Sequence, residues 1–377
     1  MLYIHIPFCK QKCSYCNFHF STSLKYKGEM LAAIKKEIGL RSHELQNKEL
    51  KSLYFGGGTP SVLEVDELKM LIDEVLKYFT FAPDIEITLE ANPDDLNSAF
   101  LKELRASEIN RLSIGTQSFF DDDLVLMNRA HSAAEAESSI KRAQDSGFEN
   151  LSIDLIYGSP TSDFSLWKES LNKAVALDVP HISAYALTVE PKTALNQWIA
   201  QNKIQPPKES EQTEDFYYMS DFLKLHGFQH YEISNFAKPR FESRHNTAYW
   251  QYREYLGLGP SAHSYDGRSE RSWNVANNQK YINALNQNIL AKETEFLSEK
   301  DRFNEMLMIG LRTAKGVDLS VLNQSFSAEI QNHLDKETSG KLQRGTLVIE
   351  NGFLKIPEVH WFLADGIAAD LFYLGGD

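Results

Sequence analysis

Residues 2–16 read LYIHIPFCKQKCSYC, a short apolar run that leads directly into a loop with three cysteines. The run is mostly aliphatic and aromatic, which is typical of a buried strand. Further runs of this kind lie at residues 50–55, 84–89, 111–118, 150–157 and 181–189, and amphipathic stretches separate them at residues 27–40, 65–78, 96–107, 133–146 and 166–177. Strands that alternate with helices pair in parallel through right-handed crossovers. The sequence therefore predicts an α/β fold with six strands in its main sheet.

Polar residues gather where the predicted strands end. Cys9, residues 56–59, Glu90, Gln117 and Asp154 each lie at or just after the carboxyl end of a strand. A (β/α) barrel builds its site at this end of its strands. The pattern therefore favours a partial, TIM-like (β/α)6 barrel over a doubly wound sheet.

The pattern changes twice along the chain. We expect the barrel to occupy residues 1–206 and a connecting segment, rich in aromatic and polar residues, to occupy residues 207–297. Residues 298–377 predict a smaller α+β module of winged-helix type. Its expected elements are helices at residues 301–313 and 319–326, a hairpin at residues 347–356 that turns at Asn351-Gly352, and a last helix at residues 362–374.

Composition narrows the class of protein. The chain has 377 residues, 42% of them hydrophobic, and a formal net charge of −13, which disfavours a general nucleic-acid binder. All three cysteines lie within eight positions, so no long-range disulfide framework is expected, and a reducing cytoplasm fits best. We find no signal-peptide pattern and no apolar stretch near the roughly 20 residues that span a bilayer. Membrane contact is expected only at the periphery.

The cysteines Cys9, Cys13 and Cys16 follow the spacing C-x3-C-x2-C. Three thiolates can hold an iron–sulfur cluster and leave one iron without a protein ligand, so that an external chelate can bind there. Two alternatives stay open: a zinc site completed by His5 or His19, and three cysteines that are simply buried. The spacing favours the cluster.

This loop, with Tyr15 just before the third cysteine, resembles the signature of the radical S-adenosylmethionine (SAM) family. The resemblance implies a [4Fe-4S] cluster on the three cysteines, with SAM chelating the fourth iron and being cleaved to a 5'-deoxyadenosyl radical when the cluster is reduced. It also implies that Arg129 suits a carboxylate, and that Glu90 and Asp154 suit ribose hydroxyls or a sulfonium. The full set of SAM-binding residues implied by the resemblance is Tyr3, Tyr15, Gly57, Gly58, Thr59, Glu90, Gln117, Arg129, Asp154 and Ala186.

A plainer interpretation exists for each of these residues. A glycine-rich loop such as residues 56–58 also forms a tight exit from a strand. A single polar side chain in an apolar strand, such as Glu90, Gln117 or Asp154, is more often a structural group with satisfied hydrogen bonds. Their shared position at strand ends favours a binding role.

The similarity covers nearly the whole chain and extends to the oxygen-independent coproporphyrinogen III oxidase group, which includes the HemW heme chaperones. Three features favour a heme chaperone. Phe18 occupies the position of a further cysteine in the oxidases, and the chain starts close to its first strand, whereas the oxidases carry an N-terminal extension. Residues 245–250, HNTAYW, resemble the H-N-x-x-Y-W motif of the chaperones. Two mild departures from the family pattern are Ser261 and Ser159.

The HNTAYW motif suggests a heme site. Imidazole is a common axial ligand of heme iron, and Tyr249 and Trp250 offer flat apolar surface to a porphyrin. On residue types alone, His245 beside two aromatic residues would more often be packed in the interior, and His230 and His263 are alternative ligands.

The resemblance implies a heme chaperone that binds a [4Fe-4S] cluster, SAM and heme, and delivers heme to hemoproteins. Respiratory, membrane-associated recipients and a homodimer are part of this expectation. The alternative is an oxygen-independent coproporphyrinogen III oxidase, an enzyme that uses SAM to convert two propionates to vinyls. A zinc-stabilised binding module is the third hypothesis.

Overall fold

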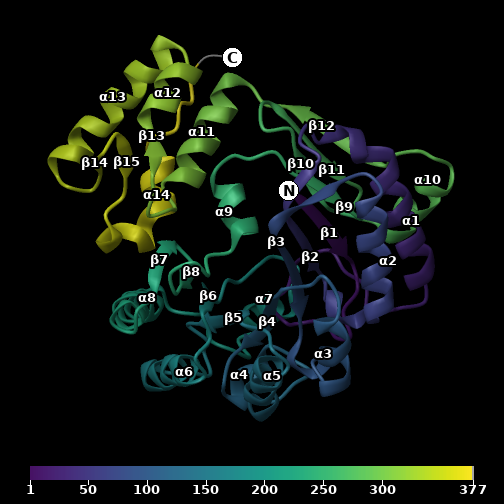
Figure 1. Ribbon diagram of the computed structural model, residues 1–377. Coiled ribbons are helices and arrows are strands. Elements are labelled where there is room, and N and C mark those ends of the chain that lie inside the picture. Colours follow the sequence, from purple (N-terminus) through teal and green to yellow (C-terminus); the bar gives the residue numbers. More distant parts are fainter. Residues whose placement is uncertain (376–377) are drawn as a thin grey trace.

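The computed structural model describes residues 1–375 and contains a nine-stranded, mostly parallel sheet, ordered β7-β8-β6-β5-β4-β3-β2-β1-β9. Strands β1 to β6 are parallel neighbours in chain order, and Figure 1 shows them as a crescent with helices on its outer side. The predicted α/β partial barrel is thus confirmed. The six strands are β1 (Leu2–Ile6), β2 (Glu49–Gly57), β3 (Thr80–Ala91), β4 (Arg111–Gln117), β5 (Asn150–Tyr157) and β6 (His181–Ala186).

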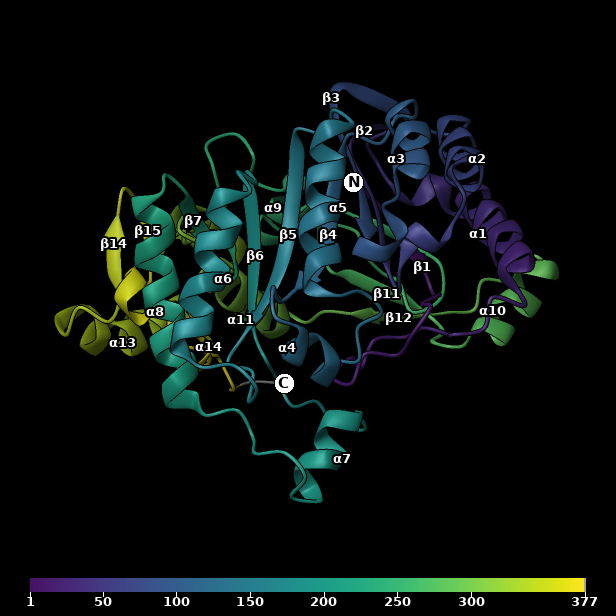
Figure 2. The same cartoon turned by 90° about the horizontal axis from the view of Figure 1, so that it is seen from below.

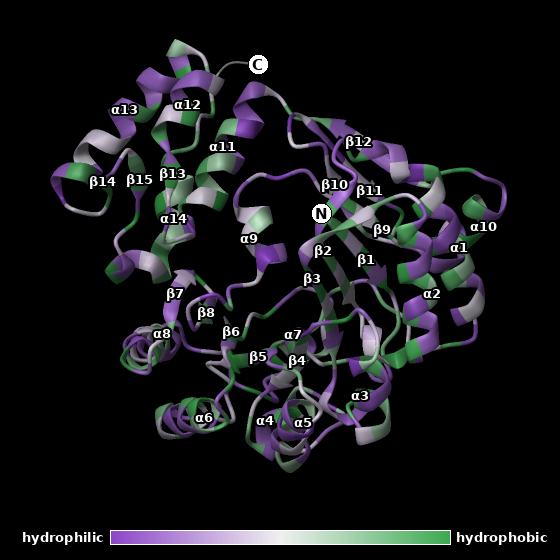
Figure 3. Cartoon of the chain, viewed as in Figure 1, coloured by the Kyte–Doolittle hydropathy of each residue, from purple (hydrophilic) through white to green (hydrophobic). Residues whose placement is uncertain are grey.

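Amphipathic helices cover the outer face of the crescent, and Figure 3 shows hydrophobic and hydrophilic residues alternating along them. Helix α2 is typical: a capping box between Glu64 and Glu67 starts it, and Leu68, Leu71 and Val75 are buried. The short helices α4 and α7 were not predicted. The helices of this layer and its loops are α1 (Lys27–Arg41), α2 (Val65–Leu76), α3 (Ser98–Arg105), α4 (Asp121–Leu126), α5 (Ala133–Asp145), α6 (Phe164–Ala176), α7 (Ala194–Ala200) and α8 (Glu209–Leu225).

Both edges of the sheet are formed by the segment that we expected only to connect two domains. Strand β9 (Leu256–Leu258) pairs in parallel with β1, and the hairpin of β7 (Gln229–Glu232) and β8 (Asn235–Ala237) pairs with β6. Strand β9 requires glycine, because a Cβ on Gly257 would lie 2.0 Å from the carbonyl oxygen of His263.

Helix α9 (Arg244–Trp250) lies on the inner side of the crescent, near the amino ends of β2 and β3 (Figure 1). The side chain of Ser243 caps it by accepting the backbone N–H of Asn246. The Glu86 carboxylate of β3 accepts the backbone N–H groups of Arg244 and His245 at 3.1 and 3.0 Å. A carboxylate at a helix N-terminus is favourable. These contacts fix α9 at the end of the sheet opposite the cysteine loop.

A second sheet of three antiparallel strands and helix α10 (Asn278–Asn286) pack beside β9 and α1. A buried network joins these parts. Glu37 of α1 accepts hydrogen bonds from the side chains of Arg41, Asn274 and Tyr281, and from the backbone N–H of Gly259. The strands of this sheet are β10 (His263–Tyr265), β11 (Glu270–Asn274) and β12 (Lys292–Phe296).

A smaller C-terminal module packs helices on a three-stranded antiparallel sheet, ordered β13-β15-β14. The hairpin turns at Asn351 and Gly352, both with positive φ, as predicted. The expected last helix at residues 362–374 is present but shorter: a 3-10 helix (Glu358–Leu363) precedes α14 (Ala364–Ala369). The other elements are α11 (Glu299–Gly310), β13 (Val317–Asp318), α12 (Leu319–Ser325), α13 (Ala328–Gln343), β14 (Val348–Glu350) and β15 (Phe353–Lys355).

The long helix α13 was not predicted from the sequence. The expected domain boundaries at 206/207 and 297/298 stay predictions, and residues 376–377 at the end of the last range lie outside the described residues. Within residues 1–375, no helix has the length and apolar character needed to cross a bilayer.

Candidate functional site

The loop after β1 carries the three cysteines, all partly exposed and none in a disulfide. The loop is held in place by backbone hydrogen bonds from Cys9 to Ser21 (3.1 Å) and from Ser14 to Met127 (3.0 Å). Burial raises the pKa of Cys9 to about 11, so this thiol stays protonated at neutral pH when it has no metal partner. A metal centre would be needed to hold it as a thiolate.

The histidines near the cysteines form hydrogen bonds with other groups. His5 contacts the Tyr3 hydroxyl with Nδ1 (3.2 Å) and the carbonyl oxygen of His19 with Nε2 (3.0 Å), and His19 Nε2 contacts Asn278 (2.7 Å). In residues 1–375, no group of three or more His, Cys, Asp or Glu side chains is arranged to hold a single metal ion. A zinc site needs four ligands around one ion. A zinc site would therefore require His5 or His19 to leave its present partners, and the choice between zinc and a cluster stays a prediction.

The glycine-rich residues 56–59 lie directly against the strand that leads into the cysteine loop. Gly58 and Thr59 donate backbone hydrogen bonds to the carbonyl oxygens of Ile6 (2.9 Å) and Phe8 (2.6 Å). A Cβ on Gly58 would lie 2.5 Å from the Phe8 oxygen, and Gly57 has a φ of +112°. The glycines therefore join the two loops into one unit at the carboxyl edge of the sheet.

Arg129 links this unit to β4. Its Nη1 lies 3.2 Å from Cys13 Sγ, and its Nη2 donates to Asn92 Oδ1 (2.7 Å) and to the carbonyl oxygen of Gly115 (2.9 Å). The Nε of Arg129 is buried and has no hydrogen-bond partner among the described residues. An unpaired buried donor is costly, so this atom suits an acceptor supplied by a ligand.

Two carboxylates face the inner side of the barrel beside this unit. Glu90 accepts from the Tyr54 hydroxyl (2.8 Å) and the backbone N–H of Gly57 (3.1 Å), and Asp154 accepts from Ser113 at 3.4 Å. Burial raises the pKa of Glu90 to about 7 and that of Asp154 to about 6. Within residues 1–375, neither forms an ion pair with Lys or Arg. The pair suits a cation or hydroxyl groups from a ligand.

The remaining SAM candidates surround these groups. Gln117 ends β4 with a φ of 64°, a conformation that is strained for a residue other than glycine. Ala186 is the last residue of β6, and Tyr15 packs beside a small apolar cluster that includes Met127 and Leu195. Tyr3 lies deeper in the barrel and stacks on Tyr54 with ring centroids 6.0 Å apart. The elements of all ten candidates meet at the barrel's inner side and its carboxyl edge.

The HNTAYW motif lies apart from the cysteine loop, on α9. His245 is 1% exposed, its Nδ1 contacts Ser52 Oγ (2.9 Å), and its Nε2 contacts the Tyr249 hydroxyl (3.1 Å). Burial lowers the pKa of His245 to about 3, so the ring is neutral. Both nitrogens are occupied, and His245 can ligate iron only if Tyr249 or Ser52 moves. The indole Nε1 of Trp250 is buried without a partner among the described residues.

The alternative heme ligands differ in access. His230 is buried, stacks on Phe236 and contacts the Glu358 carboxylate at 2.9 Å. His263 is exposed and stacks on Trp273 with ring centroids 5.9 Å apart. Among His230, His245 and His263, only the last is open to solvent.

Two residues that organise the site were not predicted from the sequence. Asn92 accepts from Arg129 and donates to Thr59 Oγ1 (3.4 Å), so it joins the β3 and β2 loops. Tyr54 binds Glu90 and stacks on His245 with centroids 4.8 Å apart. The signal for Asn92 was present, since it follows Glu90 just past a strand end. Tyr54 lies two residues before Gly56 and so faces the same side of β2.

Comparisons with known proteins identify the family of the chain. Residues 3–174 match the radical SAM superfamily, and residues 297–363 match the HemN C-terminal domain. The heme chaperone HemW of Bacillus subtilis is 36% identical over 84% of this chain and 84% of its own length. That of Lactococcus lactis is 32% identical over 87% and 86%, and that of Synechocystis is 36% identical over 87% and 82%.

Among solved structures, coproporphyrinogen III oxidase (HemN) from Escherichia coli, described as a radical SAM enzyme, matches with a TM-score of 0.83 and 23% identity. The match covers 98% of this chain and 89% of the oxidase, and it shows that the two share a fold. With the extent of the HemW matches and the cysteine loop after β1, the chain belongs to the HemW family of radical SAM proteins.

Proposed function

We propose that the chain is a heme chaperone that holds a [4Fe-4S] cluster on Cys9, Cys13 and Cys16, binds SAM at the open iron and delivers heme to hemoproteins. The observation that carries the proposal is the cysteine loop with Arg129 against Cys13 and an unpaired Nε beside it. The names of the relatives support the heme part. A cytoplasmic location, respiratory recipients at the membrane and a homodimer complete the proposal.

The residues of the chain would position SAM. The Nε–H of Arg129 would donate a hydrogen bond to the carboxylate of SAM, and Glu90 and Asp154 would bind its ribose hydroxyls or sulfonium. The residues present fit the ligand, because an unpaired donor and two carboxylates without a cation lie on the same side of the barrel. When bound, the reduced cluster with SAM supplies radical chemistry.

SAM binding is expected to depend on pH through Glu90. The raised pKa, about 7, means that Glu90 changes from mostly protonated at pH 6 to mostly ionised at pH 8. Because the ionised form attracts a sulfonium, cluster-loaded protein should bind SAM about 3- to 10-fold more tightly at pH 8 than at pH 6. Equilibrium dialysis with labelled SAM measures this. The Glu90→Gln variant should lose most of the dependence, and an unchanged dependence would contradict the role of Glu90.

Two variants on α9 test whether His245 binds heme. If His245 is the iron ligand, His245→Ala should weaken heme binding by about tenfold or more, and the change is seen in the heme Soret band. Tyr249→Phe removes only the hydroxyl that occupies Nε2, so heme should bind at least as tightly to it as to wild type. A His245 that only packs in the interior would give no gain in the Tyr249→Phe variant.

The oxidase is the alternative function, since its fold is shared. Phe18, which replaces the further cysteine of the oxidases, is 71% exposed beside the cysteine loop. Wild-type protein, reconstituted anaerobically with iron and sulfide, should bind about one heme per chain. The same preparation with SAM, reductant and coproporphyrinogen should form no vinyl product. Vinyl product without heme binding would establish the oxidase instead.

A further inference from the structure

Helix α9 and the C-terminal module face each other inside the crescent. Figure 1 shows α9 between this module and the strands β2 and β3, and Figure 2 shows α9, α11 and α14 together behind β5 and β6. Arg312, which follows α11, lies beside Trp250 at the end of α9, with its Cζ 5.8 Å from the ring centroid. A guanidinium of the C-terminal module is therefore placed against the HNTAYW motif.

The edge of the main sheet fixes the backbone of Arg312. The carbonyl oxygen of Arg312 accepts the backbone N–H of Ile233 (3.0 Å), and the backbone N–H of Ala314 donates to the carbonyl oxygen of Tyr231 (3.1 Å). Residues 312–314 thus pair with the edge strand β7 like a short antiparallel strand. A ligand that binds at Arg312 therefore loses little affinity to the ordering of the chain.

The guanidinium of Arg312 has donors to spare. Among the described residues, only its Nη1 donates a hydrogen bond, to the carboxylate of Asp365. The two side chains are 24% and 56% exposed, so this is a weak surface ion pair. Glu232 is also near, and burial raises its pKa to about 7, but within the described part of the chain it forms no ion pair with Arg312. Nε and Nη2 can therefore bind an acceptor from a ligand.

Trp250 adds a second kind of donor beside Arg312. Its indole Nε1 is buried and has no hydrogen-bond partner among the described residues. An unpaired buried N–H is costly, so it suits an acceptor that a ligand supplies. Residues 246–250 are nevertheless all partly exposed, so a ligand from solvent can reach this part of α9. An indole N–H next to a guanidinium is a donor set that suits a carboxylate.

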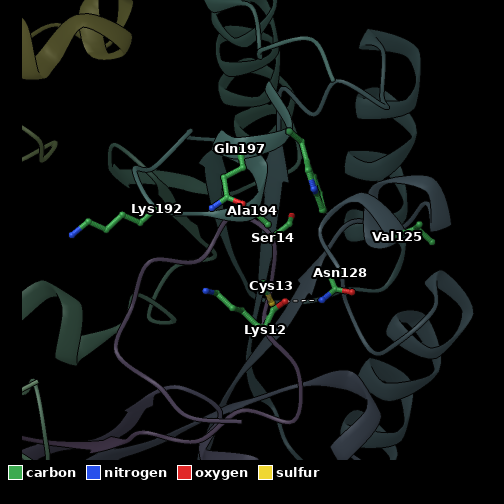
Figure 4. A pocket seen from close by; sticks show the side chains of 9 residues that line it. Lys12, Cys13, Ser14, Val125, Asn128, Lys192, Ala194 and Gln197 are labelled. Carbon is green, nitrogen blue, oxygen red and sulfur yellow. Dashed lines mark hydrogen bonds between the residues drawn. The ribbon is translucent and has the colours of Figure 1, made fainter. Parts of the chain in front are cut away.

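The cavity beside the cysteine loop offers no comparable donor set. It has a volume of about 400 Å³, and Figure 4 shows Lys12 and Cys13 in its wall. Because Cys13 is a proposed cluster ligand, this space belongs to the cysteine loop. Within residues 1–375, none of the buried polar atoms without a partner belongs to its lining. The contact between Arg312 and Trp250 is therefore the stronger candidate for a carboxylate.

We propose that Arg312, together with the indole N–H of Trp250, binds a propionate of heme, so that heme lies between α9 and the C-terminal module. The proposal rests on the proposed function and names a residue outside the HNTAYW motif that recognises the cargo. Heme carries two propionates, and a carboxylate is the planar acceptor that a guanidinium binds through two parallel hydrogen bonds. The C-terminal module supplies the charge, and α9 supplies aromatic surface.

The test compares the binding of heme and of heme dimethyl ester, which lacks both charges, to the full chain with its cluster reconstituted. Wild type should bind heme about tenfold more tightly than the ester, and Arg312→Gln should bind heme about tenfold more weakly than wild type but the ester equally well. If Arg312 only packs against Trp250, the substitution weakens both ligands by the same factor, and the proposal is wrong. Arg344→Gln is the matched control, because Arg344 is exposed at the end of α13, and it should bind both ligands like wild type.

Asp365→Asn is a second variant, at an exposed position where folding is not at risk. It removes the acidic partner of Arg312, so heme should bind about two- to fivefold more tightly and the ester should bind as before. A preference for heme over the ester that does not rise would contradict the site, even if Arg312→Gln fails to fold. Iron and sulfide content and circular dichroism show whether each variant folds.

The outcome for wild type separates this proposal from the proposed function. If wild type binds heme and the ester equally well, no carboxylate is recognised and the role of Arg312 is overturned, although the chaperone function stands. Failure of wild type to bind heme at all would instead remove the proposed function.

Discussion

Replacing Cys13 with alanine is expected to abolish the iron–sulfur cluster. Iron and sulfide should fall from about four each per chain to below about 0.5 after anaerobic reconstitution. Two reasons combine at this position. One of only three thiolate ligands is lost, and Arg129 is left with a buried charge that no longer faces a sulfur. Chemical analysis and the broad absorption of the cluster measure the result.

The control for this variant is Gln11→Ala, in the same loop. Gln11 is exposed, and its side chain binds Asn128 rather than the site. Its iron content should match that of wild type. A Cys13→Ala protein that retains most of its iron and sulfide would show that the cysteine loop does not hold the cluster. A wild-type protein that binds zinc in place of iron would support the zinc site instead of the cluster.

Replacing Glu37 with alanine is expected to lower the free energy of unfolding by about 3–5 kcal/mol. Glu37 and Arg41 are each 1% exposed, so the substitution removes one partner of a buried ion pair. It also leaves the hydroxyl of Tyr281, the amide of Asn274 and the backbone N–H of Gly259 without their acceptor. This is a large part of the 5–15 kcal/mol that is typical of a folded protein.

Urea unfolding, followed by circular dichroism, measures the effect of Glu37→Ala. Lys69→Ala is the control, because Lys69 and Asp66 form an exposed pair 3.9 Å apart whose loss should cost less than about 0.5 kcal/mol. Glu37→Gln keeps most of the shape and should fall between the two. If Glu37→Ala and Lys69→Ala unfold at the same urea concentration, the network does not hold α1 to the second sheet.

The main sheet was predictable because its strands are long enough to show a pattern. Strands β7, β8 and β9 have only three or four residues each, and such runs carry no clear period. Helix α13 was missed for a related reason: its buried positions, Ile330, Leu334 and Thr338, form a single narrow stripe in an otherwise polar segment. Burial of that stripe depends on neighbours that lie far away in the sequence.

The site was predictable in part for a geometric reason. Parallel strands end at one edge, so residues such as Glu90 and Asp154 were expected to converge there, and the structure places both on the inner side of the barrel. The burial and the hydrogen-bond partners of His245 were not predictable. Its burial depends on Ser52 and Glu86, which lie more than a hundred residues earlier. The residues next to His245 in the sequence are aromatic, and aromatic neighbours suit a heme site and a packed interior equally well.

The position of β1 inside the sheet has a consequence for the order of events during synthesis. Leu2 pairs with Leu53 on one side and with Leu256 on the other, although β1 is the first strand made. Translation at about 5–20 residues per second separates β1 from β9 by on the order of 10–50 s. During this interval the cysteine loop lacks one neighbouring strand. The open edge of β1 is therefore closed only after residues 256–258 have been made, long after the cysteine loop itself.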